Sequence, residues 1–376
     1  MFVIAGGLAL FGALMVYSAS AMMALKESNE TSQYTYFIKQ IVFVLVGIVA
    51  MFAVSRIDYH VFENKWIIYG ILAITSIALL AVFAFPAING AQRWIRFGGF
   101  SFQPSELAKI ALPMFLAWFL TKNEESVTDL KSTVFPCLAG LGLLAGLVML
   151  EKDLGTTIVL CAIFSAVYFA AGARLMHIAS VAAVFVVIGA GAIFFAPWRV
   201  ARIMAFLDPY KYSDDEAYQV VQSLYAIGSG GIFGEGFAKG QQKLFYLPYP
   251  YSDFIFSVVG EELGLVGTMA VVIAFGLLLW RGTRAALMAP DRFGTLLGIG
   301  LITGIIAQAL FNISVVISIL PAKGIPLPFI SYGGSSVVVT LIGVGILLSI
   351  SKYAGTTVVK ESARDSANYR RRPRTV

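Results

Sequence analysis

The run FVIAGGLALFGALMVYSASAMMA, residues Phe2–Ala24, decides the fold class. It holds 23 residues and no charged side chain, and about 20 such residues are enough to cross a bilayer as a helix. Nine further apolar runs follow, at Phe37–Val54, Trp66–Ile88, Leu107–Leu120, Val134–Leu150, Leu154–Ala171, Met176–Ala196, Phe254–Trp280, Phe293–Ile319 and Phe329–Ile350. The sequence therefore predicts an all-α integral membrane protein, a bundle of about ten transmembrane helices.

Composition supports the same class. Of the 376 residues, 59% are hydrophobic and 13% are charged, whereas a soluble domain carries about 25% charged residues. The 36 glycines fit a bundle in lipid, because small residues let membrane helices approach closely. The N-terminal run has no basic segment before it and no small-residue cleavage site after Leu25, which predicts a retained helix and not a cleaved signal peptide.

Positive charge is concentrated at the C-terminus. The net charge is +6, and the segment from Lys352 onward contributes +5 of it through seven cations and two acidic residues. A basic segment directly after a last membrane helix is typical of a cytoplasmic anchor on anionic lipid, so no nucleic-acid partner is expected. The two histidines, His60 and His177, have no partners at metal-ligand spacing.

The loop charges predict an orientation. With the N-terminus inside, the cytoplasmic segments hold fifteen Lys and Arg residues, and the opposite short loops hold six. Because positive loops stay in the cytoplasm, both termini are expected there. Residues 1–355 then form one polytopic membrane domain, and residues 356–376 form a basic cytoplasmic tail. Residues 197–252 form a large extracytoplasmic loop between helices 7 and 8, in which Glu216–Ile227 has an amphipathic pattern.

The first polar motif is GAQRWIRFGGFSFQPSELAK, Gly90–Lys109. Glu106 and Lys109 are three residues apart, so they share one face of a helix. A lysine inside a membrane helix is costly, which marks Lys109 as a functional or paired residue. Together with Arg93 and Arg96 of the preceding loop, it provides cations near one carboxylate, suited to a pyrophosphate.

Some residues of the polar motifs also suit a purely structural role. Gln103, Ser105 and Glu106 can cap a helix that has Pro104 in its first turn. Asp153, in EKDLGTT at Glu151–Thr157, directly precedes an apolar run, in the position of a helix N-cap. From the residues alone, the structural and the functional roles both stay open.

The motif PYPYSDFIFSVVGEELG, Pro248–Gly264, places acidic side chains along one apolar stretch. Asp253 stands at its outer edge, where helix capping is again the plain alternative. Glu261 and Glu262 lie deeper in the stretch, and buried carboxylates need partners. The candidate partners for these carboxylates are Lys109, Arg93 and Arg202.

The last motif is PAKGIPLPFISYGGSS, Pro321–Ser336. Its three prolines and three glycines interrupt any regular helix. Irregular backbone at membrane depth is tolerated where protein or a water-filled cavity covers it. A re-entrant, cavity-lining segment is therefore expected, with a tight outer loop as the alternative.

Taken together, the motifs occur in the order found in one protein family. The chain resembles the SEDS proteins (shape, elongation, division and sporulation) in GAQRWIRF with FQPSELAK, DLGTT, AIGSGG with GFAKGQQKLFYLP, SDFIFSVVGEELG and GIPLPFISYGGSS. The resemblance covers about residues 56–351. PLPFISYGGSS and SDFIFSVVGEELG are more similar to the FtsW and SpoVE branch than to RodA. The chain departs from the family pattern at Lys152, where many relatives have proline.

The resemblance implies a fold and an activity. SEDS proteins have ten membrane helices with both termini in the cytoplasm, and they lie in the bacterial cytoplasmic membrane. They act as peptidoglycan glycosyltransferases on lipid II and the growing lipid-linked glycan, together with a class B penicillin-binding protein and other division or elongation proteins. A lipid II flippase is the alternative activity, which would need a cationic path through the bundle. No organic cofactor is implied.

The resemblance also implies a set of site residues. Asp253 corresponds to the essential acid at the outer end of the eighth helix, where it is expected to act as a general base toward a sugar hydroxyl. Ligation of Mg²⁺ or Mn²⁺ by Asp253 is the alternative role. The other implied functional positions are Arg93, Gln103, Glu106, Lys109, Asp153, Arg202, Ser331 and Ser335. Among them, Arg93, Lys109 and Arg202 are expected near the phosphates of the substrate.

Overall fold

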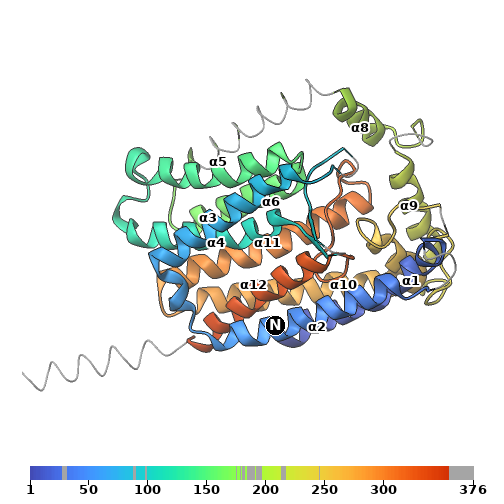
Figure 1. Ribbon diagram of the computed structural model, residues 1–376, viewed down its shortest axis with the longest axis horizontal. Coiled ribbons are helices and arrows are strands. Elements are labelled where there is room, and N and C mark those ends of the chain that lie inside the picture. The colour runs from blue at the N-terminus through green and yellow to red at the C-terminus, as the bar shows by residue number, and fades with distance from the viewer. Residues whose placement is uncertain are drawn as a thin grey trace, which may run out of the picture.

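The apolar runs form a bundle of roughly parallel and antiparallel helices (Figure 1). The computed structural model describes residues 1–27, 32–87, 90–97, 100–174, 176, 177, 179, 183, 191, 197–212, 217–244 and 246–354. In that part of the chain, seven helices are long and apolar enough to cross a membrane. They are α1 (Phe2–Glu27), α2 (Thr35–Arg56), α3 (Lys65–Ala81, extended by the turn Val82–Ala84), α5 (Phe135–Leu150, preceded by the turn Leu130–Val134), α10 (Ile255–Leu287), α11 (Arg292–Val316) and α12 (Gly334–Lys352). The chain is therefore a multi-pass membrane protein.

Two further helices of the bundle are shorter or carry more charge. Helix α4 (Pro104–Lys122) packs against α3, α6 and α11, and α6 (Leu154–Ala170) packs against α5 and α11. Helix α4 begins three residues before the expected start at Leu107, because Pro104 is accommodated in the first turn. The expected helix Met176–Ala196 lies mostly outside the described residues, and the tail 356–376 lies wholly outside them.

Glycines allow close contact between helices α2 and α12. A Cβ atom at Gly345 would lie 2.7 Å from the Met51 carbonyl oxygen, and one at Gly47 would lie 2.6 Å from the Leu341 side chain. Both distances are shorter than a real Cβ contact, so the two helices could not lie this close together with a larger residue at either position.

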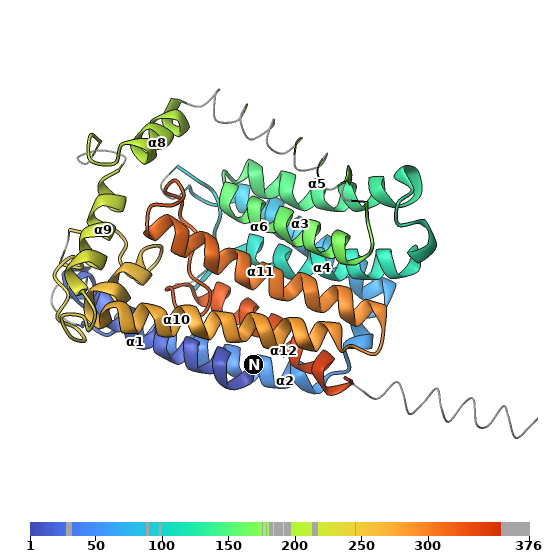
Figure 2. The same ribbon diagram turned by 180° about the vertical axis from the view of Figure 1, so that it is seen from behind.

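The polar motifs gather at one end of the bundle, beside α8 (Pro197–Leu207) and α9 (Tyr218–Gly230) (Figures 1 and 2). Helix α9 includes most of the predicted amphipathic stretch, Glu216–Ile227, of which Glu216 lies outside the described residues. Helix α8 was not expected. The short antiparallel pair β1 (Ile95–Phe97) and β2 (Phe100–Phe102) was also not expected, because strands of three residues leave no periodic pattern. The remaining short elements are the turns Tyr59–Glu63 and Glu124–Ser126. Residues 317–333, between α11 and α12, are irregular, and they include most of the motif predicted to be irregular, Pro321–Ser336. Helix α11 ends at Val316 instead of the predicted Ile319, and α12 begins at Gly334 instead of the predicted Phe329.

Candidate active site

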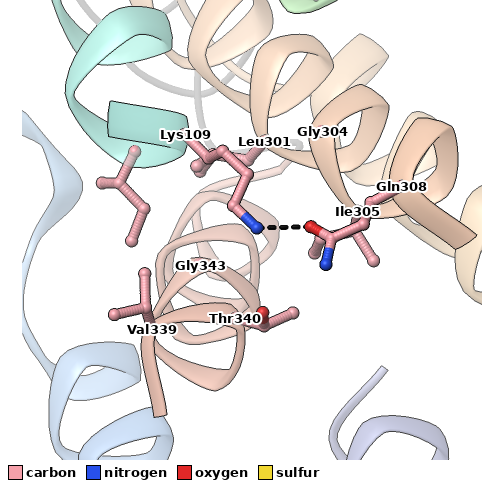
Figure 3. Close-up of a pocket in the computed structure, with 9 residues that line it drawn as sticks. Lys109, Leu301, Gly304, Ile305, Gln308, Val339, Thr340 and Gly343 are labelled. Carbon is pink, nitrogen blue, oxygen red and sulfur yellow. Dashed lines mark hydrogen bonds between the residues drawn. The ribbon is translucent and has the colours of Figure 1, made fainter. Parts of the chain in front are cut away.

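A buried ion pair lies inside the bundle, between α4, α11 and α12. Lys109 Nζ lies 2.7 Å from Glu106 Oε2, and it also donates a hydrogen bond to Gln308 Oε1 (Figure 3). Ser336 Oγ donates to Glu106 Oε2 at 2.9 Å. Lys109 is 9% exposed and Glu106 is 1% exposed, so each charge is neutralised where it would be costly alone. The pairing expected from the three-residue spacing is confirmed.

The same lysine lines a small pocket between these helices (Figure 3). Gln308 and Thr340 are the other side chains with polar atoms there, and the remaining walls are apolar. The remaining lining residues are Ile110, Leu301, Gly304, Ile305, Val339 and Gly343. A pocket with so few polar groups does not suit a disaccharide.

A second polar cluster lies where the segment before β1 meets the turn between α5 and α6. The Arg93 guanidinium donates to the Glu151 carbonyl at 3.4 Å and to the Lys152 carbonyl at 2.5 Å. Its Nη1 atom lies 4.0 Å from Asp153 Oδ1. Asp153 caps α6, because its Oδ1 accepts from the Thr156 N–H at 3.1 Å and its Oδ2 accepts from Thr156 Oγ1 at 2.8 Å. The predicted N-cap is confirmed, and the capping carboxylate also faces a cation.

Lys152 has an unusual backbone conformation in this turn. Its φ is 63°, in the left-handed region, whereas the ring of proline holds φ near −65°. Proline could not adopt this backbone conformation, and this is the position at which the chain departs from the family pattern. The Lys152 side chain donates from Nζ to the Gly90 carbonyl at 3.0 Å, which links the turn to the loop that carries Arg93.

Asp253 directly precedes α10, and its side chain does not cap that helix. Phe254 occupies the N-cap position, and no side-chain bond caps the helix there, so the capping interpretation of Asp253 is wrong. Asn312 Nδ2 donates to the Asp253 carbonyl at 2.8 Å and thereby holds its backbone. Within the described residues, no side-chain hydrogen bond or ion pair holds the carboxylate itself. The carboxylate is therefore free to accept a proton or a ligand.

The acidic side chains at this end of the bundle, Asp253, Asp153 and Glu151, share their electrostatic environment. Burial raises the pKa of Asp253 to about 6, while Arg93 acts to lower it and Asp153 to raise it. The pKa of Glu151 is raised to about 8, mainly by burial and also by the charge of Asp153, while Arg93 acts to lower it. Both oxygens of the Glu151 carboxylate are buried and have no hydrogen-bond partner in the described part of the chain. Arg93 thus serves as the common counter-charge for three carboxylates.

Ser331 and Ser335 tie the irregular segment to its surroundings. Ser331 Oγ donates to the Ser252 carbonyl at 2.5 Å and accepts from the Leu327 N–H at 2.7 Å. Ser335 Oγ accepts from the backbone N–H of Gln103 at 3.2 Å. Ser331 therefore holds the residue next to Asp253, and Ser335 holds the start of α4.

Gln103 links the start of α4 to the cluster that contains Asp153. It occupies the N-cap position of α4 but makes no side-chain cap bond, so the capping alternative for Gln103 is wrong. Instead its Nε2 donates to Ser105 Oγ at 3.0 Å and lies 3.4 Å from Asp153 Oδ2. The side chain thus reaches from α4 toward the turn that carries Asp153.

The cations expected near a pyrophosphate contact different elements. Arg93 binds the turn between α5 and α6. The prediction that it lies beside the Glu106–Lys109 pair is wrong. Arg202 is exposed on α8 and lines a small pocket with Ala322 of the irregular segment. Of the three cations, Arg93 is the one that acts on the pKa of Asp253.

Within the described residues, neither deep carboxylate on α10 binds an expected partner. Glu261 Oε1 accepts from the backbone N–H groups of Gln241 and Gln242. Glu262 pairs with Lys243 at 2.5 Å, and not with Arg93, Lys109 or Arg202. Sequence reasoning also missed Gln308 and Asn312 on α11. Their side-chain amides donate to the Pro326 and Asp253 carbonyls, respectively. The motif GFAKGQQKLFYLP contains Lys243, but nothing in its spacing points to a residue nineteen positions later.

A dedicated metal cage is absent from the described residues, which contain no group of three His, Cys, Asp or Glu side chains placed to hold an ion. A single free carboxylate such as Asp253 still fits Mg²⁺ or Mn²⁺ in the way common at phosphate sites. There the ion takes one or two carboxylates from the protein, and its other ligands come from the substrate phosphates and water.

Comparison with known sequences identifies relatives over nearly the whole chain. A model of the FtsW, RodA and SpoVE family, described as cell cycle protein, matches residues 1–356. A probable peptidoglycan glycosyltransferase FtsW of Geobacter sp. strain M18 is 40% identical, covering 91% of this chain and 93% of its own. Stage V sporulation protein E of Bacillus subtilis strain 168 is 38% identical, also covering 91% of this chain and 93% of its own.

Solved structures show the same relationship. A chain of a peptidoglycan synthase complex, described as coordinating polymerization and crosslinking, has a TM-score of 0.73 at 26% identity and covers 92% of this chain and 97% of its own. The rod shape determining protein RodA of Thermus thermophilus has a TM-score of 0.66 at 25% identity, covering 94% of this chain and 95% of its own. The higher identity to FtsW and SpoVE agrees with the branch that the motifs predicted. The chain belongs to the FtsW, RodA and SpoVE family of cell cycle proteins, the SEDS family that its motifs resemble.

Proposed function

We propose that this chain is a peptidoglycan glycosyltransferase that polymerises lipid II, with Asp253 as its general base. The observation that carries the proposal is the state of the Asp253 carboxylate. It is partly buried, no described side chain holds it, and burial raises its pKa to about 6. A base works best when its pKa lies near the operating pH, because it is then ionised yet still basic.

The reaction needs a proton acceptor beside the attacking sugar. A hydroxyl of one sugar attacks the anomeric carbon of the other, while Asp253 accepts the hydroxyl proton. The new glycosidic bond forms as the bond to the lipid pyrophosphate breaks, and the pyrophosphate leaves with its lipid. Arg93 is suited to take up the negative charge that develops on the leaving group, because it already acts electrostatically on Asp253.

The other site residues have supporting roles in this proposal. Asp153 and Gln103 hold the turn that faces Arg93, Ser331 and Ser335 hold the irregular segment, and the Glu106–Lys109 pair braces α4. Arg202 is proposed to meet the substrate from α8. Ligation of Mg²⁺ or Mn²⁺ by Asp253 is the alternative to its role as the base, and such an ion would supply charge neutralisation at the phosphates.

The proposed setting follows from the loop charges. Ten helices cross the bacterial cytoplasmic membrane with both termini in the cytoplasm, and the end that carries Asp253, α8 and α9 faces outward. Lipid II and the growing glycan meet the site there. A class B penicillin-binding protein is the proposed crosslinking partner, supported by the likeness to a synthase complex that coordinates polymerization and crosslinking.

The deciding experiment separates polymerisation from transport. Purified protein in detergent is incubated with lipid II, and the products are resolved by gel electrophoresis. The same protein in liposomes is tested for movement of fluorescent lipid II between leaflets. Glycan polymer without translocation supports the proposal. Translocation without polymer would replace it with the flippase alternative.

A further inference from the structure

Helix α10 is broken at Gly264, where φ is 65° and ψ is −159°. A glycine-rich segment, residues 230–243, closes on the break and bonds the backbone groups that the break exposes. The bonds run from the Glu235 N–H to the Glu261 carbonyl, from Gly236 to Glu262, from Leu265 to Gly231 and from Val266 to Ile232. The outer part of α10, Ile255–Leu263, is therefore a separate short rod whose base is held by this segment.

Glycine is required where the segment meets the rod. A Cβ atom at Gly230 would lie 2.0 Å from the Gly260 carbonyl oxygen, and one at Gly234 would lie 2.2 Å from the Glu262 carbonyl oxygen. Both contacts are with backbone, which cannot move aside as a flexible side chain can. The segment and the rod thus meet backbone against backbone.

A buried ion pair locks the same contact. Lys243 Nζ lies 2.5 Å from Glu262 Oε1, and Ser18 of α1 bonds both partners, donating to Glu262 at 2.6 Å and accepting from Lys243 at 2.8 Å. Glu262 Oε2 accepts from the Ala238 N–H at 2.9 Å. Lys243 is 9% exposed and Glu262 is fully buried. Buried pairs of this kind add little net stability but can fix one arrangement of the chain.

Asp253 lies midway between the two charged residues along the chain, ten residues after Lys243 and nine before Glu262. The ion pair therefore closes a loop that has Asp253 at its centre. Bonds to the Tyr251, Ser252 and Asp253 carbonyls, from the Tyr332 N–H, Ser331 Oγ and Asn312 Nδ2, hold the opposite end of this loop. The backbone of Asp253 is thus held at the tip, and the two chain segments that lead to it are joined at the base.

We propose that Lys243 and Glu262 are positioning residues for the transfer reaction, acting through the outer rod of α10 to aim the Asp253 carboxylate. This inference rests on the proposed function. It adds that the ion pair governs how often the carboxylate is correctly placed once the substrate is bound. A misplacement of about 1 Å costs roughly 10²-fold in rate even when binding is intact.

The test removes both charges together, because a single substitution would leave an unpaired buried charge and risk misfolding. The double variant Lys243→Met/Glu262→Gln is compared with wild type for polymerisation of lipid II, thermal unfolding and monodispersity. The expected result is a kcat lowered by roughly 10²-fold, with an unchanged KM and an unchanged melting temperature. Lys243→Arg keeps the pair and is expected to retain most of the wild-type kcat.

The matched control is Arg292→Gln/Glu124→Gln, which removes another ion pair at the opposite end of the bundle and is expected to leave kcat unchanged. The inference is overturned if the double variant of Lys243 and Glu262 keeps the wild-type kcat, if only KM rises, or if its kcat falls together with its melting temperature. It is also overturned if Lys243→Arg is as slow as the double variant. A wild-type protein that makes no polymer would instead overturn the proposed function, and the inference with it.

Discussion

Gly324 of the irregular segment faces the carboxylate of Asp253 so closely that a Cβ atom on Gly324 would lie 2.7 Å from Asp253 Oδ2. Backbone and carboxylate cannot both keep their places if the glycine gains a side chain. Because the carboxylate is the movable partner, Gly324→Ala is expected to push it out of its resting position. The segment between α11 and α12 therefore forms one wall of the space that Asp253 occupies.

The first prediction follows from this contact. Gly324→Ala is expected to lower the kcat for lipid II polymerisation by at least about 10-fold, because a displaced base transfers protons less often. Gly333→Ala is the control in the same segment, since its new Cβ would meet Ser336 at an ordinary 3.6 Å. Equal rates for the two variants would show that the position of the Asp253 carboxylate does not limit the reaction.

The second prediction concerns the ion pair inside the bundle. Among the described residues, Lys109→Met leaves the buried Glu106 carboxylate with Ser336 as its one side-chain hydrogen-bond partner. Losing one member of a buried pair costs about 3–5 kcal/mol. The double variant Glu106→Gln/Lys109→Met removes both charges and is expected to recover most of that stability. Thermal unfolding of the three purified proteins checks this order. A double variant no more stable than Lys109→Met would contradict the pairing.

Local spacing predicted the features that depend on neighbours along the chain. The apolar runs marked the bundle, Glu106 and Lys109 were paired from their three-residue spacing, and Asp153 was placed as an N-cap. Each of these contacts lies within one helix or at its first turn. Helical spacing along the sequence is enough to predict contacts of this kind.

Contacts between distant segments were not predictable in the same way. Lys243 reaches Glu262 only because a glycine-rich segment folds back onto a break in α10. Arg93 was expected beside Lys109 but binds a turn nearly sixty residues later. Asn312 and Gln308 looked like ordinary polar residues of a long helix, and their roles depend on where the irregular segment lies. Tertiary placement, which no periodic pattern encodes, decides all of these.

The third prediction concerns orientation in the membrane. A cysteine in place of Phe233, which is 82% exposed on the glycine-rich segment, is expected to react in intact cells with a reagent that cannot cross the membrane. Partly buried Cys161 is first replaced by alanine, and buried Cys137 is left in place. A cysteine in place of Lys65, at the start of α3 on the opposite side, is expected to react only after the cells are opened. The reverse pattern would invert the proposed topology.

The last prediction joins activity and stability at Asp253. Asp253→Asn keeps the size of the side chain but cannot accept the proton, and loss of a general base lowers kcat by about 10²–10⁴-fold. Because burial raises the pKa of Asp253 to about 6, the wild-type rate is expected to rise as the pH increases through 6 and then to level off. The folded state binds this proton more tightly than the unfolded state, so the stability that comes with protonation is present at low pH and is lost as the pH rises through 6. At pH 7.5 the wild type therefore holds a buried carboxylate that the variant lacks, and Asp253→Asn is expected to melt at a higher temperature. The difference in melting temperature should shrink as the pH falls to 5. A variant that is inactive and equally less stable at both pH values would mean that Asp253 supports the fold instead of accepting the proton.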